Sequence, residues 1–146
     1  YLARCALVGI FPWAHSGTVG ARDIFELQDK LRPWYRLFAI RGDSDLSTMQ
    51  FLPYHRQTAV LVDNPWVRAA MYWNEDEAIV ILANSESADE QQAEARILPE
   101  QFGWPADADL NVEAARDCRE LEPTSDGAFE VTLPGYGYGA WHITRR

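Results

Sequence analysis

The feature that most constrains this chain is a series of short apolar runs, separated by turn signals, over residues 58–146. Residues 67–73 alternate in character, residues 74–76 are polar, and residues 78–83 are continuously apolar. Alternation indicates a strand buried on one face, whereas a continuous run indicates a strand buried on both faces. About seven or eight such runs fit here, which is typical of an antiparallel β-sandwich, with Greek-key-like connections expected. The other expected strands are residues 59–62, 92–98, 110–115, 119–121, 129–133 and 140–144, with a helical turn at 99–103.

Residues 1–57 have a different pattern, which predicts an α/β segment. The apolar run at residues 7–11 is predicted as a strand buried on both faces, although residues 3–7 are also compatible with a helix. A loop with two glycines follows at residues 12–20. Residues 21–31 then have helical spacing, and Pro33 is expected to break or kink this helix.

The charge distribution divides the chain at about the same point. Residues 1–57 carry seven basic and five acidic side chains, whereas residues 58–146 carry six basic and seventeen acidic ones. A step of this size indicates two regions with different surroundings. We therefore expect a first region over 1–57 and a β-sandwich over 58–146. The apolar fraction of 47% excludes wholesale disorder.

Composition also limits the partners and the compartment. A net charge of −9 argues against nucleic acid, which requires a basic surface, and no apolar run approaches the length of a membrane span. The compartment is left open, and a soluble protein, cytoplasmic or secreted, is expected. Cys5 and Cys118 are interpreted as free thiols. Because the chain begins with Tyr1 and not with Met, it is interpreted as a fragment or a processed product.

Residues 58–146 resemble the C-terminal β-sandwich that follows the catalytic (β/α) barrel in glycoside hydrolases of the amylase and galactosidase type. Residues 67–85 resemble a hairpin of that domain that ends in Ile-Leu-Ala-Asn-Ser. Residues 111–121 resemble a strand and an Asp-centred turn. Residues 129–143 resemble the closing pattern, with Phe-Glu-Val-Thr-Leu-Pro-Gly-Tyr-Gly-Tyr at its start.

Residues 1–57 look like the end of such a barrel. Residues 5–13 would be the last barrel strand, residues 24–40 the closing helix, and residues 51–55 a junction resembling one in glycoside hydrolases akin to family 123. The resemblance implies that this first region cannot bury its apolar faces alone. Its expected partner is the rest of the barrel, supplied covalently or as another chain.

A catalytic carboxylate pair is not expected on this chain. Glycosidases use two carboxylates, which in barrel enzymes follow the C-terminal ends of strands. Residues 11–20, which would follow the last barrel strand, contain neither Asp nor Glu. Asp23 and Glu26 are interpreted as first-turn helix residues favoured by the helix dipole. The three histidines have no metal-ligand spacing, so neither a metal nor a cofactor is expected.

Three residues are candidates for contact with a sugar. Within an intact barrel, Trp13 could stack on a sugar ring and His15 could hydrogen-bond its hydroxyl groups. Trp104 follows a glycine in a predicted loop and is the best candidate for an exposed aromatic platform. The interpretation that we favour is that Trp13 packs beneath its own loop, that His15 is solvated, and that the sandwich aromatics, Trp73 and Trp141 among them, pack in the core or in interdomain contacts.

Three functions remain open from the sequence. The favoured hypothesis is the C-terminal part of a glycoside hydrolase, in which the sandwich supports a catalytic barrel encoded upstream; whether this chain is itself an enzyme is uncertain. The second is a carbohydrate-binding β-sandwich without catalysis. The third is an acidic interaction domain unrelated to sugars. The substrate and the stereochemistry of the reaction are left open.

Overall fold

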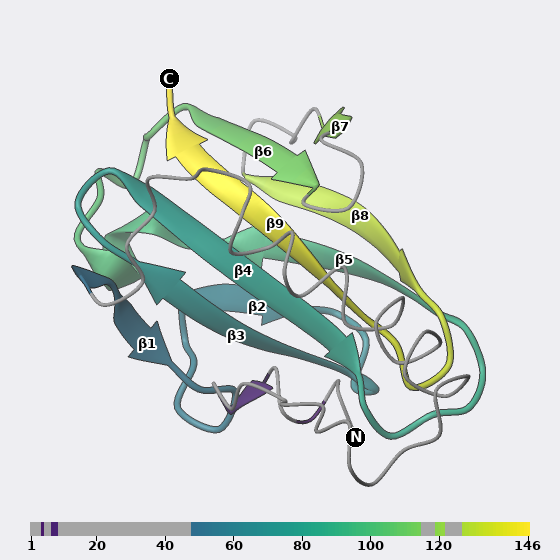
Figure 1. The fold of residues 1–146 in the computed structure, drawn as a ribbon. Helices are drawn as coiled ribbons and strands as arrows, with labels where there is room; N and C mark the ends of the chain where they lie inside the picture. The colour runs from purple at the N-terminus through teal and green to yellow at the C-terminus, as the bar shows by residue number, and fades with distance from the viewer. Residues whose placement is uncertain (1–3, 5–6, 9–47, 115–118, 122–126) are drawn as a thin grey trace, which may run out of the picture.

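The computed structural model describes Arg4, Leu7, Val8 and residues 48–114, 119–121 and 127–146, and these residues form two antiparallel sheets (Figure 1). The first sheet has the strand order β1-β3-β4-β9-β6-β7, and the second has the order β2-β5-β8. The strands are β1 (Gln50–Leu52), β2 (Val60–Val62), β3 (Val67–Trp73), β4 (Glu77–Asn84), β5 (Gln91–Ile97), β6 (Leu110–Ala114), β7 (Arg119–Leu121), β8 (Ala128–Leu133) and β9 (Tyr138–Arg145). The predicted β-sandwich is confirmed.

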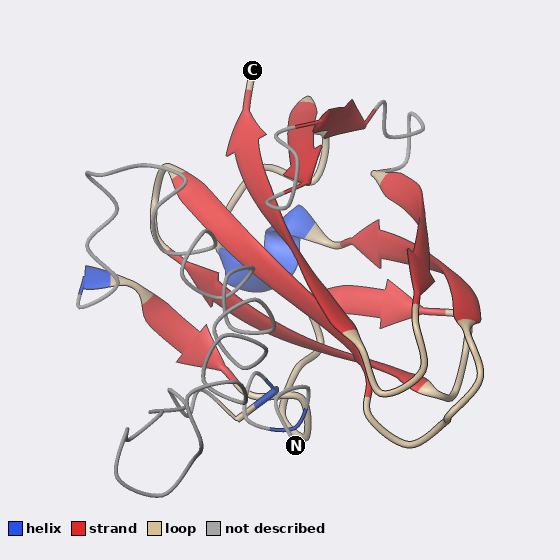
Figure 2. Cartoon of the chain, turned by 45° about the vertical axis from the view of Figure 1, so that its right-hand side comes forward, coloured by secondary structure: helices blue, strands red, loops and turns tan. Residues whose placement is uncertain are grey.

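The connections between the sheets are Greek-key-like. The chain forms the β3–β4 hairpin, crosses to the second sheet for β5, and later returns so that β9 lies between β4 and β6. Strand β9 pairs with β4 from Glu77–Thr144 to Ala83–Tyr138. The predicted helical turn is the 3₁₀ helix η2 (Pro99–Phe102), which lies between β5 and β6 in the chain (Figure 2).

Most predicted strands lie within two residues of their observed bounds, and three places differ. Strand β9 begins at Tyr138, two residues before the strand that was expected at 140–144. Residues 51 and 52 belong to the expected junction, and together with Gln50 they form β1 against β3. The strand expected from Leu7 onward is wrong at its start, because Arg4 and Leu7 are helical and Val8 lies in a turn. This agrees with the helical alternative, since periodicity cannot distinguish a short apolar strand from a helix.

The core lies between the two sheets. It combines Met71, Val80 and Ile143 of the first sheet with Ala95 and Leu133 of the second. The Trp141 side chain is buried there, with its ring centroid 5.8 Å from that of Phe129, as predicted for a core aromatic. Trp73 is only partly buried and packs at the margin of this cluster.

The opposite face of the first sheet is also apolar. Because side chains alternate along a strand, Tyr72, Ile79 and Ile81 point away from the second sheet, yet each is at least nine-tenths buried. We call this surface the outer face, and its members on β3, β4 and β9 are Arg68, Ala70, Tyr72, Glu77, Ile79, Ile81, Ala83, Tyr138, Ala140, His142 and Thr144. An antiparallel sheet that faces water usually carries polar residues there. The outer face therefore has the character of a packing surface.

Asn84 fastens two loops at the end of β4. Its side chain is fully buried, and its Nδ2 donates to the carbonyl oxygens of Asp89 at 2.8 Å and Pro134 at 3.2 Å. Its Oδ1 accepts from the backbone N–H of Ser87 at 3.1 Å. Across the same junction, the Tyr136 N–H donates to the Ser87 carbonyl oxygen. Gly135 and Tyr136 thus form a turn before β9 begins at Tyr138, and Tyr136 is exposed.

No helix among the described residues has the length and apolar character needed to cross a membrane.

Candidate functional site

The three predicted site residues have different outcomes. Trp13 and His15 lie outside the described residues, so their contacts with a sugar remain predictions. Trp104 is described, and only 5% of its surface is accessible, so it does not form an exposed platform and instead agrees with the packing interpretation. The chain does form a loop after Gly103, but that loop folds the indole back onto the first sheet.

Three contacts hold the Trp104 side chain. Its Nε1–H donates to the Asn74 carbonyl oxygen at 3.2 Å. The Phe102 ring meets it edge-on at a centroid distance of 4.9 Å, and the Arg145 guanidinium lies over it at 5.2 Å. Gly103, at φ +89°, provides the left-handed residue that ends η2 and reverses the chain toward Trp104. Trp104 therefore anchors the β3–β4 turn, and Arg145 occupies one face of its ring.

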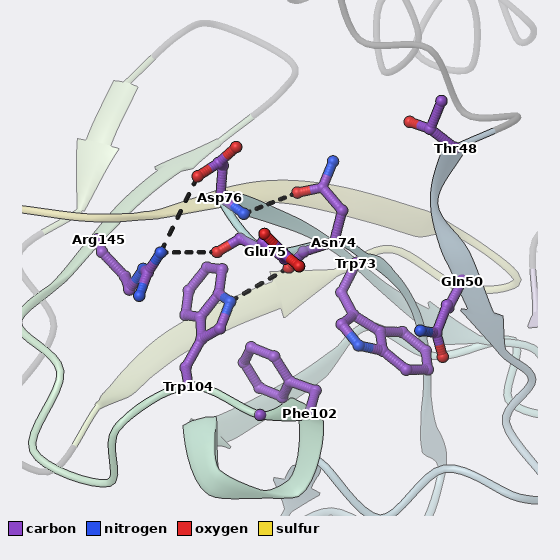
Figure 3. A pocket seen from close by; sticks show the side chains of 10 residues that line it. Thr48, Gln50, Trp73, Asn74, Glu75, Asp76, Phe102, Trp104 and Arg145 are labelled. Carbon is purple, nitrogen blue, oxygen red and sulfur yellow. Dashed lines mark hydrogen bonds and ion pairs between the residues drawn. The ribbon is translucent and has the colours of Figure 1, made fainter.

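A pocket of about 790 Å³ opens beside this anchor (Figure 3). It lies where β3 ends, close to the β3–β4 turn and to η2. Gln50 of β1 is the register partner of Trp73, so these two side chains share the same face of the sheet. The residues that line the pocket are Thr48, Gln50, Trp73, Asn74, Glu75, Asp76, Phe102, Gly103, Trp104 and Arg145.

Part of the polar wall is occupied by contacts that shape the turn. Asn74 Oδ1 accepts from the backbone N–H groups of Asp76 and Glu77, each at 2.9 Å. Arg145 Nη2 donates to the Glu75 carbonyl oxygen at 2.7 Å and lies 3.9 Å from Asp76 Oδ1. These bonds fix the turn because the Asn side chain replaces a backbone acceptor. They leave the side-chain carboxylates of Glu75 and Asp76 on the solvent side.

The remaining polar groups are open to a ligand. Within the described part of the chain, the Gln50 amide, Asn74 Nδ2 and the Glu75 carboxylate have no hydrogen-bond partner. The residues that line the pocket include two carboxylates and one guanidinium, so the net charge of the lining is negative. Since Asp76 is 93% exposed, its carboxylate is solvated and is not placed as a buried general acid would be. The arrangement is therefore suited to binding.

The described residues contain no group of three or more His, Cys, Asp or Glu side chains arranged to hold a metal ion. A buried histidine does occur elsewhere: His142 Nε2 lies 2.6 Å from Glu77 Oε2 on the outer face. The pair belongs to that packing surface, with His142 4% exposed.

Sequence reasoning did not identify most of the pocket. Residues 74–76 were interpreted only as a turn, and Arg145 was not considered. Gln50 directly precedes the expected junction, and its cross-strand position opposite Trp73 depends on the β1–β3 pairing. A local signal did exist, because an aromatic residue directly precedes two acids in Trp-Asn-Glu-Asp.

The fold is similar to parts of solved glycoside hydrolase structures. An α-amylase from Anoxybacillus matches 83% of this chain and 23% of its own length, with 15% identity and a TM-score of 0.51. A trehalose-6-phosphate hydrolase from Bacillus licheniformis matches 93% of this chain and 23% of its own, with 17% identity and a TM-score of 0.45. The chain thus spans about a quarter of these proteins. Neither a family model nor a curated protein matches it.

Proposed function

We propose that this chain is the C-terminal portion of a glycoside hydrolase. Residues 58–146 would form a structural sandwich that supports a catalytic barrel, and residues 1–57 would complete that barrel. Hydrolysis of the glycosidic bond would use carboxylates encoded upstream. The likeness to the Anoxybacillus α-amylase supports the fold, and a fold alone does not determine a function.

The observation that carries the proposal is the outer face. Ile79 and Ile81 are the register partners of His142 and Ala140, and all four side chains lie on the side of the first sheet opposite the core. Their burial removes apolar surface from water at a place where a freestanding sandwich would be hydrated. A supporting domain needs such a surface, because it stabilises its neighbour by packing against it.

The proposal can be tested in the longer protein that contains the sequence preceding Tyr1. Ile79→Asp buries a carboxylate on the outer face, whereas Leu61→Asp introduces the same group at a side chain that is 52% exposed. We expect thermal inactivation of glycoside hydrolysis to shift down by several degrees in Ile79→Asp and to stay unchanged in Leu61→Asp. Ile79→Met, which keeps an apolar side chain, should retain the inactivation temperature of the original protein. Equal inactivation temperatures for the two Asp variants would rule out a supporting role for the outer face.

A further inference from the structure

The pocket beside Trp73 has the composition of a sugar-binding site. Figure 3 shows the Trp73 and Gln50 side chains toward one end of the pocket lining and Arg145 toward the other, with the Asn74–Asp76 turn between them. Its volume of about 790 Å³ lies within the range of small-molecule sites, roughly 300–1,000 Å³.

Some groups that line the pocket already contact one another and fix its shape, whereas others are available to contact a ligand. Trp104 already donates its indole N–H to Asn74 and carries Arg145 over its ring. Trp73 has no such contacts among the described residues, and its side chain is only partly buried. Trp73 is therefore the aromatic side chain available for stacking, in place of the Trp104 that the sequence favoured.

The charges of the wall limit the class of ligand. Glu75 and Asp76 outnumber Arg145, whose guanidinium is engaged with the Glu75 carbonyl oxygen. A phosphate or a uronic acid would meet net negative charge, which is unfavourable. A carboxylate accepts hydrogen bonds from hydroxyl groups, and an amide both accepts them and donates them. An indole face packs against the apolar side of a pyranose ring.

We propose that this pocket binds one or two units of a neutral oligosaccharide, with Trp73 as the stacking platform and Gln50 and Glu75 as hydroxyl partners. The site holds polysaccharide and performs no chemistry. Only the choice of a sugar rests on the proposed function, because the pocket itself belongs to the sandwich. Binding to this chain requires no catalytic barrel, so a failure here is distinguishable from a failure of the hydrolase proposal.

The test titrates the full 146-residue chain with maltohexaose, cellohexaose and xylohexaose, by calorimetry. We expect at least one of them to bind, Trp73→Ala to weaken binding roughly tenfold or more, and Gln50→Ala to weaken it severalfold. Trp66→Ala is the matched control, because Trp66 lies just before the opposite end of β3 and is 49% exposed.

If Trp73→Ala does not fold, Gln50→Ala decides the question, since Gln50 is exposed at the edge strand β1. Selective weakening in the pocket variants, with unchanged binding in Trp66→Ala, supports the site. The proposed site is overturned if none of the three oligosaccharides binds at a concentration of about 10 mM. It is also overturned if Gln50→Ala and the original chain bind with equal affinity.

Discussion

His142 Nε2 lies 2.6 Å from Glu77 Oε2, and both side chains belong to the outer face of the first sheet. The His142 side chain is 5% exposed and that of Glu77 is 15% exposed, so the contact is shielded from solvent. A buried polar pair within a largely apolar face must be satisfied internally, because an unpaired buried polar group costs free energy.

Glu77→Ala should lower the free energy of unfolding by about 1–3 kcal/mol, because it removes a hydrogen-bond partner of a buried imidazole. Glu77→Gln keeps an acceptor and should lose less. The measurement is urea unfolding followed by circular dichroism. The control is Glu94→Ala, since Glu94 lies 3.7 Å from Arg96 and both side chains are more than two-fifths exposed. A loss in Glu77→Ala no larger than in the control would contradict the assigned pairing.

Asn84→Ala should be among the most destabilising polar-to-alanine changes in the sandwich. The variant leaves the carbonyl oxygens of Asp89 and Pro134 and the N–H of Ser87 without the partner they have now. We expect a loss of about 2–3 kcal/mol in denaturant unfolding. Asn111→Ala, which removes only a 3.5 Å contact with Arg146, should change stability by less than about 0.5 kcal/mol. Similar losses of unfolding free energy in the two variants would show that the Asn84 hydrogen bonds do not stabilise the two loops.

Alkaline pH should destabilise the fold through Tyr72. Burial raises the pKa of the Tyr72 phenol above its ordinary value of 10.0. Its neutral form therefore supports the folded state fully below pH 10, and this support is lost as the pH rises toward the folded-state pKa. The midpoint of urea unfolding should fall above about pH 10. The fall should be smaller in Tyr72→Phe and unaltered in Tyr54→Phe, which removes an exposed phenol. An identical alkaline fall in Tyr72→Phe and the original chain would count against this role.

Two glycines are expected to respond differently to alanine. At Gly135 an added Cβ would overlap the carbonyl group of Ala88, which is backbone and cannot move aside cheaply. At Gly103 a Cβ meets nothing within 4 Å, and only the positive φ of +89° is unfavourable. Gly103→Ala should therefore cost about 1 kcal/mol, and Gly135→Ala should cost more. Thermal unfolding of the two variants decides this, and a smaller loss in Gly135→Ala would contradict the close approach of the two loops.

The fold was predictable because its signals are local. The alternation in residues 67–73 and the apolar run in residues 78–83 each specify a strand, and the Asn74–Asp76 turn joins them. β1 was missed because it has only three residues and depends on pairing with β3. Leu7 was misassigned because a short apolar run fits a helix equally well.

The site was harder to predict because it depends on long-range contacts. A loop position after a glycine suggested that Trp104 is exposed, but its burial depends on Asn74 and Arg145, which are distant in sequence. Trp73 alternates with core residues, so it was assigned to the core. The strand ends at that residue, and the side chain lines the pocket as well. Alternation in the sequence indicates on which face of the first sheet a side chain lies. It does not indicate whether the second sheet extends far enough to cover that side chain.

The most direct test of the proposed function is hydrolysis by the longer protein that includes the sequence before Tyr1. The purified protein is incubated with a panel of oligosaccharides and aryl glycosides, and the released sugar is measured. We predict hydrolysis of at least one glycosidic linkage, together with loss of activity when an upstream carboxylate at a barrel strand end is replaced by its amide. A folded longer protein that cleaves no member of the panel would contradict the account.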